Sequence, residues 1–215
     1  FVSTFSRRPS TLFAGAGVRS AITIGARSGE ESLSTTEIRR WWSEFRPHLF
    51  GTTQYARLTP TGASDPWPRP GRSLVPLYDR LTTTSGRLAN SVRKTGPELG
   101  FKQTALYYLS VFIDEPPAWT LEGLRTPQTK VGWLRFHDEI QRNVGYVLLS
   151  GRLAVWWWAA TGDDFDVTTG LLSDFPISPL QVEGIWDELN EFAGQLRTEQ
   201  QKHPLVTKYA GKEMG

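Results

Sequence analysis

The chain of 215 residues contains no cysteine and carries a formal net charge of +2 at pH 7. The absence of cysteine excludes disulfides and thiolate metal sites, and the wide separation of the three histidines disfavours a zinc site or a histidine-based catalytic triad: His48, His137 and His203. No apolar run approaches the roughly 20 residues that a bilayer crossing needs and the first residues lack a signal-peptide layout, so we expect a cytoplasmic protein without a membrane partner or a bound metal.

The small net charge hides an uneven distribution. Residues 1–110 hold 15 Lys and Arg against 7 Asp and Glu, whereas residues 111–215 hold 9 against 15. Of the 15 basic residues in the first part, 13 are arginines, which suit bidentate contacts with phosphates and guanines. This asymmetry is typical of a protein that turns one side to a polyanion. An ordinary solvated arginine surface is the alternative explanation.

The first element in chain order is a strand. Residues 18–25 alternate apolar and polar side chains, which predicts a strand, and Gly15 and Gly17 form a turn just before it. Glycine-rich loops that cradle phosphates follow a strand and open a helix. Because this turn opens a strand, we do not expect nucleotide binding there.

A helix is predicted over residues 37–45. Thr35 or Thr36 can cap its start, and Pro47 ends it. An apolar stripe at i, i+3, i+4 and i+7 favours burial in the core over stacking on bases. The stripe consists of Ile38, Trp41, Trp42 and Phe45.

Two basic segments follow. Residues 59–73 contain four prolines and two glycines, so they are predicted to form a long loop, either a nucleic-acid contact or a surface excursion. Residues 74–88 are amphipathic. Residues 80–94 have no acidic side chain and combine basic residues with hydroxyl and amide donors of the kind that contact DNA backbones.

The remainder of the chain predicts an α+β class. Strands are expected within residues 101–113 and at 131–136, and one or two helices over 138–160. An acidic amphipathic helix is expected from residue 178 to about 201, then a frayed tail. The run of Trp156, Trp157 and Trp158 is apolar on most faces, so we expect it in the core. Strands and helices alternate without a regular βαβ rhythm.

The order of residue types in residues 8–24 is the first sign of a family. Arg8-Pro9 and Leu12-Phe13 precede Gly15, Arg19 and Ile22. This order resembles the R-P-x-x-L-F-x-G-x-x-x-R-x-x-I segment, the motif VIII region near the end of the catalytic domain, in adenine-specific N6 DNA methyltransferases. These are enzymes of the TaqI and type IIG kind, from restriction-modification and phage-defence systems.

A second stretch resembles the end of the target-recognition domain of the same enzymes. The apolar run of residues 147–160 leads to an acidic turn at 163–166, a Val-Thr pair and Phe175-Pro176-Ile177. The family's Asn-Ser before the apolar run is Leu149-Ser150 here. The stretches lie about 130 residues apart and bracket most of the chain.

Two family features are missing from the sequence. One is the glycine-rich loop that holds the methyl donor, S-adenosylmethionine. The other is the Asn/Asp/Ser-Pro-Pro-Tyr/Phe motif that holds the target amino group. Glu115-Pro116-Pro117-Ala118 lacks both the small polar residue and the aromatic residue of that motif. We therefore expect no catalytic residue in this chain, and either a fragment or one subunit of a split enzyme, with S-adenosylmethionine bound by the parent enzyme.

The resemblance implies three regions and one site residue. Residues 1–30 correspond to the edge of a catalytic domain, 31–178 to a target-recognition domain with mixed strands and helices, and 179–215 to a C-terminal helix and tail. In the family, an aromatic before the motif VIII strand packs against the flipped adenine, and Phe13 stands at that place. Anchoring of the turn is the structural alternative for Phe13.

Recognition residues differ between relatives, so candidates for DNA binding come from side-chain chemistry alone. They are Arg57, Arg69, Arg72, Arg80, Arg87, Arg93, Lys94 and Lys102. The aspartates of the acidic turn lack calcium-loop spacing, and we expect a structural turn without metal.

We expect a module that binds double-stranded DNA beside a methyltransferase core or other defence subunits. The alternatives are a free-standing DNA-binding specificity subunit and a protein-interaction scaffold with no DNA role.

Overall fold

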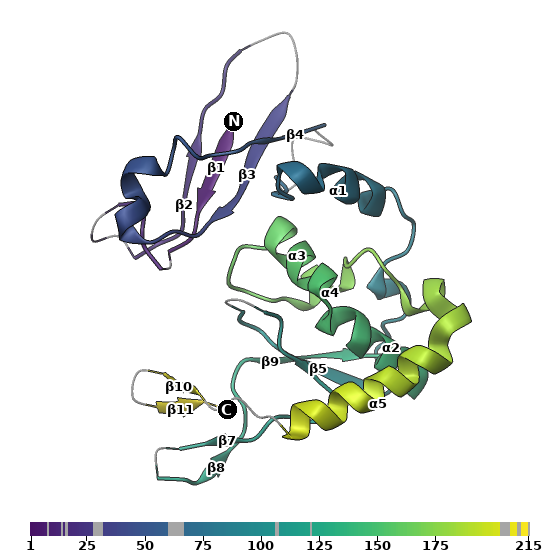
Figure 1. The fold of residues 1–215 in the computed structure, drawn as a ribbon. Coiled ribbons are helices and arrows are strands. Elements are labelled where there is room, and N and C mark those ends of the chain that lie inside the picture. Colours follow the sequence, from purple (N-terminus) through teal and green to yellow (C-terminus); the bar gives the residue numbers. More distant parts are fainter. Residues whose placement is uncertain are drawn as a thin grey trace. The chain divides into compact units, whose positions relative to one another are not determined.

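A computed structural model describes residues 1–7, 9–13, 15, 17–27, 32–59, 67–105, 108–120, 122–202, 207–209 and 212–214. The chain divides into two compact units. The N-terminal unit comprises Phe1–Thr84 with Trp156–Asp164, and the C-terminal unit comprises Ser85–Val155 with Phe165–Gly215. Small sheets, helices and a long C-terminal helix make up the fold (Figure 1), so the α+β class is confirmed.

The N-terminal unit is built on a four-stranded sheet. Its strands are β1 (Val2–Phe5), β2 (Ser20–Thr23), β3 (Leu33–Arg39) and β4 (Ala56–Leu58), in the order β2-β1-β3-β4. β1 runs antiparallel to β2 and parallel to β3, and β4 is antiparallel to β3. The strand predicted over residues 18–25 is confirmed by β2.

The helix predicted over residues 37–45 is wrong. β3 continues to Arg39, and only a 3₁₀ helix follows, η1 (Ser43–His48). Thr36, a predicted helix cap, lies buried in β3, and its hydroxyl accepts a hydrogen bond from the Thr4 amide at 3.0 Å. Pairing with β1 overrides the local capping signal, because long-range strand contacts outweigh a single cap.

A cluster of buried apolar side chains forms the core beside this sheet. Phe5, Leu12, Trp41 and Leu49 form one buried cluster, and Ile22 packs against it. Trp41 is therefore a core residue as predicted. Trp42 and Phe45, from the same predicted stripe, are exposed.

Helical segments complete the N-terminal unit. η2 (Arg72–Leu74) leads into α1 (Val75–Thr82), and the unit boundary falls inside α3 (Arg152–Thr161). Trp157 stacks on Tyr78 with ring centroids 6.0 Å apart, and Trp156 Nε1 donates to the Pro70 carbonyl at 3.0 Å. Trp157 and Trp158 are buried, so the tryptophan run is a core element, as predicted.

The C-terminal unit contains a three-stranded antiparallel sheet in the order β6-β5-β9. The central strand β5 (Glu98–Lys102) pairs with β6 (Val111–Phe112) and with β9 (Val131–Arg135). These strands confirm the predictions within residues 101–113 and at 131–136, although β5 begins three residues earlier.

Helices accompany this sheet. α2 (Glu139–Ser150) is capped by Asp138, whose carboxylate accepts from the Gln141 amide at 2.8 Å. α5 (Trp186–Lys202) packs against α2. The shorter helices are η3 (Leu88–Asn90), α4 (Thr169–Ser173) and η4 (Pro179–Ile185). The one or two helices predicted over residues 138–160 are confirmed as α2 and α3. The acidic helix predicted from residue 178 is confirmed from Trp186 onward as α5, and η4 precedes it.

Two hairpins were not predicted. β7 (Ala118–Trp119) pairs with β8 (Arg125–Thr126), and β10 (Thr207–Tyr209) pairs with β11 (Lys212–Met214). The predicted frayed tail is thus wrong for these last two segments, and its other residues lie outside the described part of the chain. No helix in the described ranges combines the length and hydrophobicity that a membrane crossing requires.

Candidate nucleic-acid interface

Phe13 lies on a fixed turn between β1 and β2. The Ser10 amide donates to the Trp41 carbonyl at 3.1 Å, and the Thr11 hydroxyl donates to the Phe13 carbonyl at 2.9 Å. Leu12 is buried in the core cluster, whereas the next residue, Phe13, is 58% exposed. The Phe13 ring is therefore presented to solvent by a turn anchored through its neighbour.

Arg46 joins this turn to η1. Its guanidinium donates to the Leu12 carbonyl at 2.7 Å and to the Thr11 carbonyl at 2.9 Å. The same guanidinium lies 4.8 Å from the centroid of the Trp41 ring, a cation–π geometry. One side chain thus fixes the turn that carries Phe13 against the segment that carries Trp42 and Phe45.

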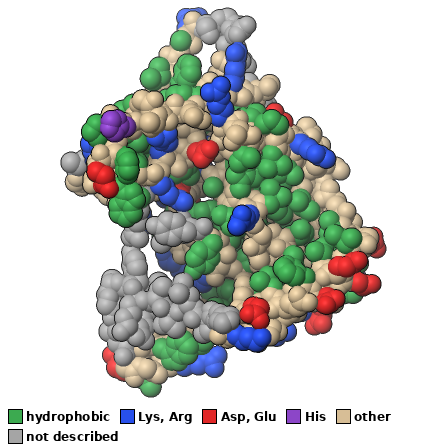
Figure 2. All heavy atoms as spheres, viewed as in Figure 1, with side chains coloured by type: hydrophobic (Ala, Val, Ile, Leu, Met, Phe, Trp, Pro, Cys, Tyr) green, Lys and Arg blue, Asp and Glu red, His purple; other side chains and the backbone are tan. Residues whose placement is uncertain are grey.

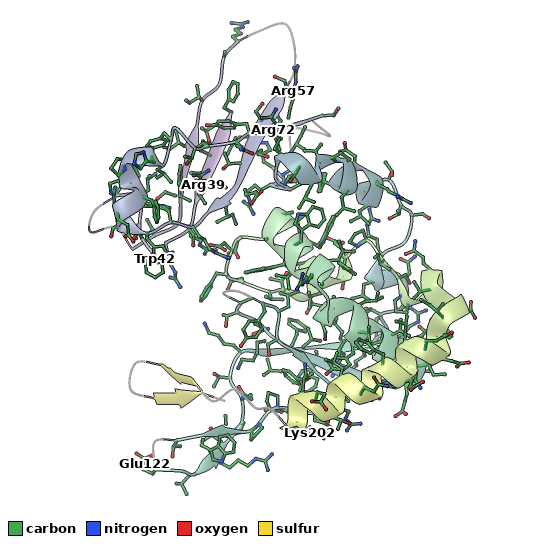
Figure 3. The ribbon with its side chains drawn as sticks, in the orientation of Figure 1. Arg39, Trp42, Arg57, Arg72, Glu122 and Lys202 are labelled. Carbon is green, nitrogen blue, oxygen red and sulfur yellow. The ribbon has the colours of Figure 1, made fainter. Side chains whose placement is uncertain are left out.

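Sequence reasoning missed Trp42 and Phe45 as surface residues. They are 61% and 56% exposed, and Figure 3 places Trp42 beyond the C-terminal end of β3. The helical spacing favoured a single buried stripe. The β-branched pair Thr35-Thr36 was the signal against it, because β-branched residues favour strands.

The predicted DNA-binding residues divide into two groups. Arg57, Arg69, Arg72 and Arg80 belong to the N-terminal unit, and Arg87, Arg93, Lys94 and Lys102 belong to the C-terminal unit.

Three arginines of the first group are exposed on adjoining elements. Arg57 lies in β4, Arg72 in η2 and Arg80 in α1, and these three elements contact one another. Figure 3 shows Arg57 and Arg72 on this part of the unit. We call Arg57, Arg72 and Arg80 the arginine edge. Exposed arginines on adjoining elements are candidates for contact with a phosphate backbone, which binds positive charge.

Arg69 differs from its neighbours. Its guanidinium donates to the Gly162 carbonyl, and its own amide donates to the Ala160 carbonyl at 2.7 Å. Burial lowers the Arg69 pKa, with the nearby carboxylate of Asp164 acting in the opposite direction. Arg69 therefore secures the end of α3, and we leave it out of the arginine edge.

In the second group, Lys102 also has internal contacts. Its Nζ donates to Gln128 Oε1 at 2.7 Å and to the Thr129 carbonyl at 2.6 Å. Burial lowers the Lys102 pKa, and Glu115 opposes that shift. Arg93 and Lys94 are exposed, which leaves them accessible to a polyanion.

The acidic turn after α3 is held by arginines. Asp164 forms an ion pair with Arg40, and Asp163 forms one with Arg19 at 2.7 Å. Asp164 adopts a positive φ of 73°. Within the described residues, no group of three or more His, Asp or Glu side chains is placed to hold a metal ion.

No protein-family model matches the chain, and neither the curated proteins nor the solved structures contain a match to it.

Proposed function

We propose that this chain is the sequence-specific DNA-recognition module of an adenine-N6 DNA methyltransferase in restriction-modification or phage defence. The observation that carries the proposal is the exposed Phe13 ring on a turn fixed by Arg46. A base-flipping enzyme needs an accessible aromatic face on a rigid support, because stacking offsets the cost of removing a base from the duplex. Phe13 meets both requirements at the position where the resemblance expects that role.

The arginine edge supports a polyanionic ligand. Phosphate contacts supply most of the sequence-independent affinity for duplex DNA. Arg57, Arg72 and Arg80 lie in the same unit as Phe13, so that one folded unit offers both phosphate contacts and an aromatic face.

Methyl transfer belongs to a catalytic core that supplies S-adenosylmethionine and the Asn-Pro-Pro-Tyr type motif. This chain positions the duplex for that core, within the cytoplasm. The core, other subunits of the defence system and double-stranded DNA are its partners. A free-standing DNA-binding specificity subunit has the same DNA contacts and differs only in its protein partner.

A protein-interaction scaffold is the second candidate, and α5 favours it. Phe192 is 51% exposed on this helix, close to the acidic Glu188 and Glu191. Figure 2 shows acidic side chains gathered along one edge of the molecule. Such an apolar and acidic surface suits a basic protein partner and repels DNA.

Selection from a pool of random duplexes tests the proposal. The purified chain is expected to enrich one short sequence motif over successive rounds, because recognition domains read base edges in the grooves. A scaffold gives no enrichment. Binding without enrichment of any motif would contradict the assignment of sequence recognition to this chain.

A further inference from the structure

We propose that Trp42 and Phe45 form, together with Phe13, a stacking surface for unpaired DNA bases. We call these three residues the aromatic platform. The inference rests on the proposed function in that the ligand is DNA. It goes further by assigning a base-contacting role to two side chains of η1 and its cap.

The platform has a rigid support. Leu12 and Trp41 are buried in one cluster, and each is followed directly in the sequence by an exposed aromatic residue, Phe13 and Trp42. The Phe45 amide donates to the Trp42 carbonyl at 2.9 Å, and Arg46 bonds the turn of Leu12 to η1. The three rings are thus carried by two segments that share one core and one arginine.

The rings of the aromatic platform are exposed, which is typical of residues that contact a ligand. All three are more than half exposed, and exposed aromatic side chains gathered on one part of a protein surface are typical of contact sites. Tryptophan and phenylalanine present flat π faces, and every base has a matching face. Such stacking changes affinity by about tenfold or more for each base.

The charge near these rings favours an anionic ligand. Arg39 donates to the carbonyls of Leu49 and Thr52 and to the Thr52 hydroxyl, and Arg46 donates to the carbonyls of Thr11 and Leu12. These acceptors are neutral, so these contacts leave both guanidinium charges uncompensated. The one carboxylate of η1, Glu44, offsets only one of the two. The backbone of a single strand follows positive charge while its bases stack on aromatic rings. The acidic surroundings of Phe192 on α5 show the opposite combination.

Unpaired bases come from two sources, a single strand and a weakened base pair in a duplex. Three fluorescent ligands distinguish them: a single-stranded oligothymidylate of about 12 nucleotides, a duplex with one mismatch, and the same duplex fully paired. Anisotropy titrations with the 215-residue chain give the affinity for each ligand.

Trp42→Ala and Phe45→Ala are each expected to weaken oligothymidylate binding about tenfold. Affinity for the paired duplex is expected to stay within about twofold. If the variants lose as much affinity for the mismatched duplex as for the oligothymidylate, the ligands are bases displaced from a duplex. If they lose affinity for the oligothymidylate alone, the ligands are single strands.

Replacement series separate stacking from apolar contact. Trp42→Phe keeps a π face and is expected to retain most of the affinity, whereas Trp42→Leu keeps apolar area and is expected to lose it. Phe192→Ala is the matched control, an exposed phenylalanine in acidic surroundings, and is expected to bind as the parent does. Thermal unfolding of each variant reports whether folding is intact.

The proposal is overturned if Trp42→Leu binds oligothymidylate as well as the parent, or if both alanine variants leave that affinity unchanged. Failure of the proposed function is a separate result, because the unmodified chain would then not bind duplex DNA. A parent that binds duplex but shows no dependence on Trp42 or Phe45 contradicts the aromatic platform alone.

Discussion

Arg40 and Asp164, which are 124 positions apart in the sequence, form an ion pair in which the aspartate side chain is only 4% exposed. The pair ties the end of β3 to the turn that follows α3, within the N-terminal unit. Because Asp164 is buried and has a positive φ, the turn depends on both the charge and the backbone conformation of this residue.

Asp164→Asn separates these two factors. Asparagine tolerates positive φ, so the backbone is retained while the charge of the buried pair is lost. The free energy of unfolding is expected to fall by about 2 kcal/mol, because a charge-assisted hydrogen bond is lost while Arg40, whose side chain is 34% exposed, keeps access to water. Urea unfolding measures the change. A loss below about 1 kcal/mol, typical of exposed pairs, would show that the pair contributes little.

Arg69 and Arg72 form a matched pair for the arginine edge. Arg69→Ala is expected to lower the unfolding midpoint, since it removes a buried donor from the end of α3. Arg72→Ala is expected to leave that midpoint unchanged and to weaken duplex binding. Thermal unfolding and duplex titrations on both variants check this. The reverse pattern would place Arg69, not Arg72, against DNA.

The buried Tyr146 side chain makes the free energy of unfolding depend on pH at alkaline values. Burial raises the Tyr146 pKa to about 12, whereas the ordinary tyrosine value is about 10. Between these values the unfolded chain releases the proton first, so the free energy of unfolding falls as pH rises through that window. The loss reaches about 3 kcal/mol at most.

Tyr146→Phe is expected to abolish this part of the pH dependence. No group in the described part of the chain accepts a hydrogen bond from the buried Tyr146 hydroxyl, so the variant is also expected to gain about 1 kcal/mol at pH 7. Tyr108→Phe, at an exposed position, controls for loss of a hydroxyl. A Tyr146→Phe variant with lower stability at pH 7 would contradict the expectation that its hydroxyl has no partner.

Phe13→Ala tests the proposed base-stacking role in a methyltransferase that contains this chain. The methylation rate is expected to fall about tenfold to a hundredfold, because one stacking contact is lost, and duplex affinity is expected to stay nearly constant. Single-turnover methylation assays and duplex titrations measure the two quantities. An unchanged methylation rate would reduce Phe13 to an anchor of its turn.

Patterns of neighbouring residues in the sequence predicted most of the helices and strands. Alternation predicted β2, β-rich composition predicted the strand around Phe101, an apolar run predicted α3, and apolar spacing predicted α5. The sequence could not reveal that β1 pairs in parallel with β3, since this contact joins distant segments. Because of that pairing, the residues predicted to begin a helix form the end of β3. The predicted aromatic stripe is therefore split, with Trp41 in the core and Trp42 and Phe45 on the surface.

The candidate site was predictable only in part. The composition of the basic segments pointed to Arg57, Arg72 and Arg80, and the resemblance pointed to Phe13. Nothing in the local sequence distinguishes Arg69 from Arg72, because only the long-range contacts of Arg69 with the end of α3 set the two apart. The exposure of Trp42 depends in the same way on where β3 ends.

The salt dependence of duplex binding tests the central claim most directly. The 215-residue chain is compared with an Arg57, Arg72 and Arg80 triple alanine variant and with a control that loses the same charge at the exposed positions Arg125, Arg152 and Lys202. The logarithm of the binding constant is expected to fall linearly with the logarithm of salt concentration, and the slope is expected to be shallower by about 2 to 3 in the arginine-edge variant only. Salt-independent binding, or one slope shared by all three proteins, would contradict DNA recognition through this unit.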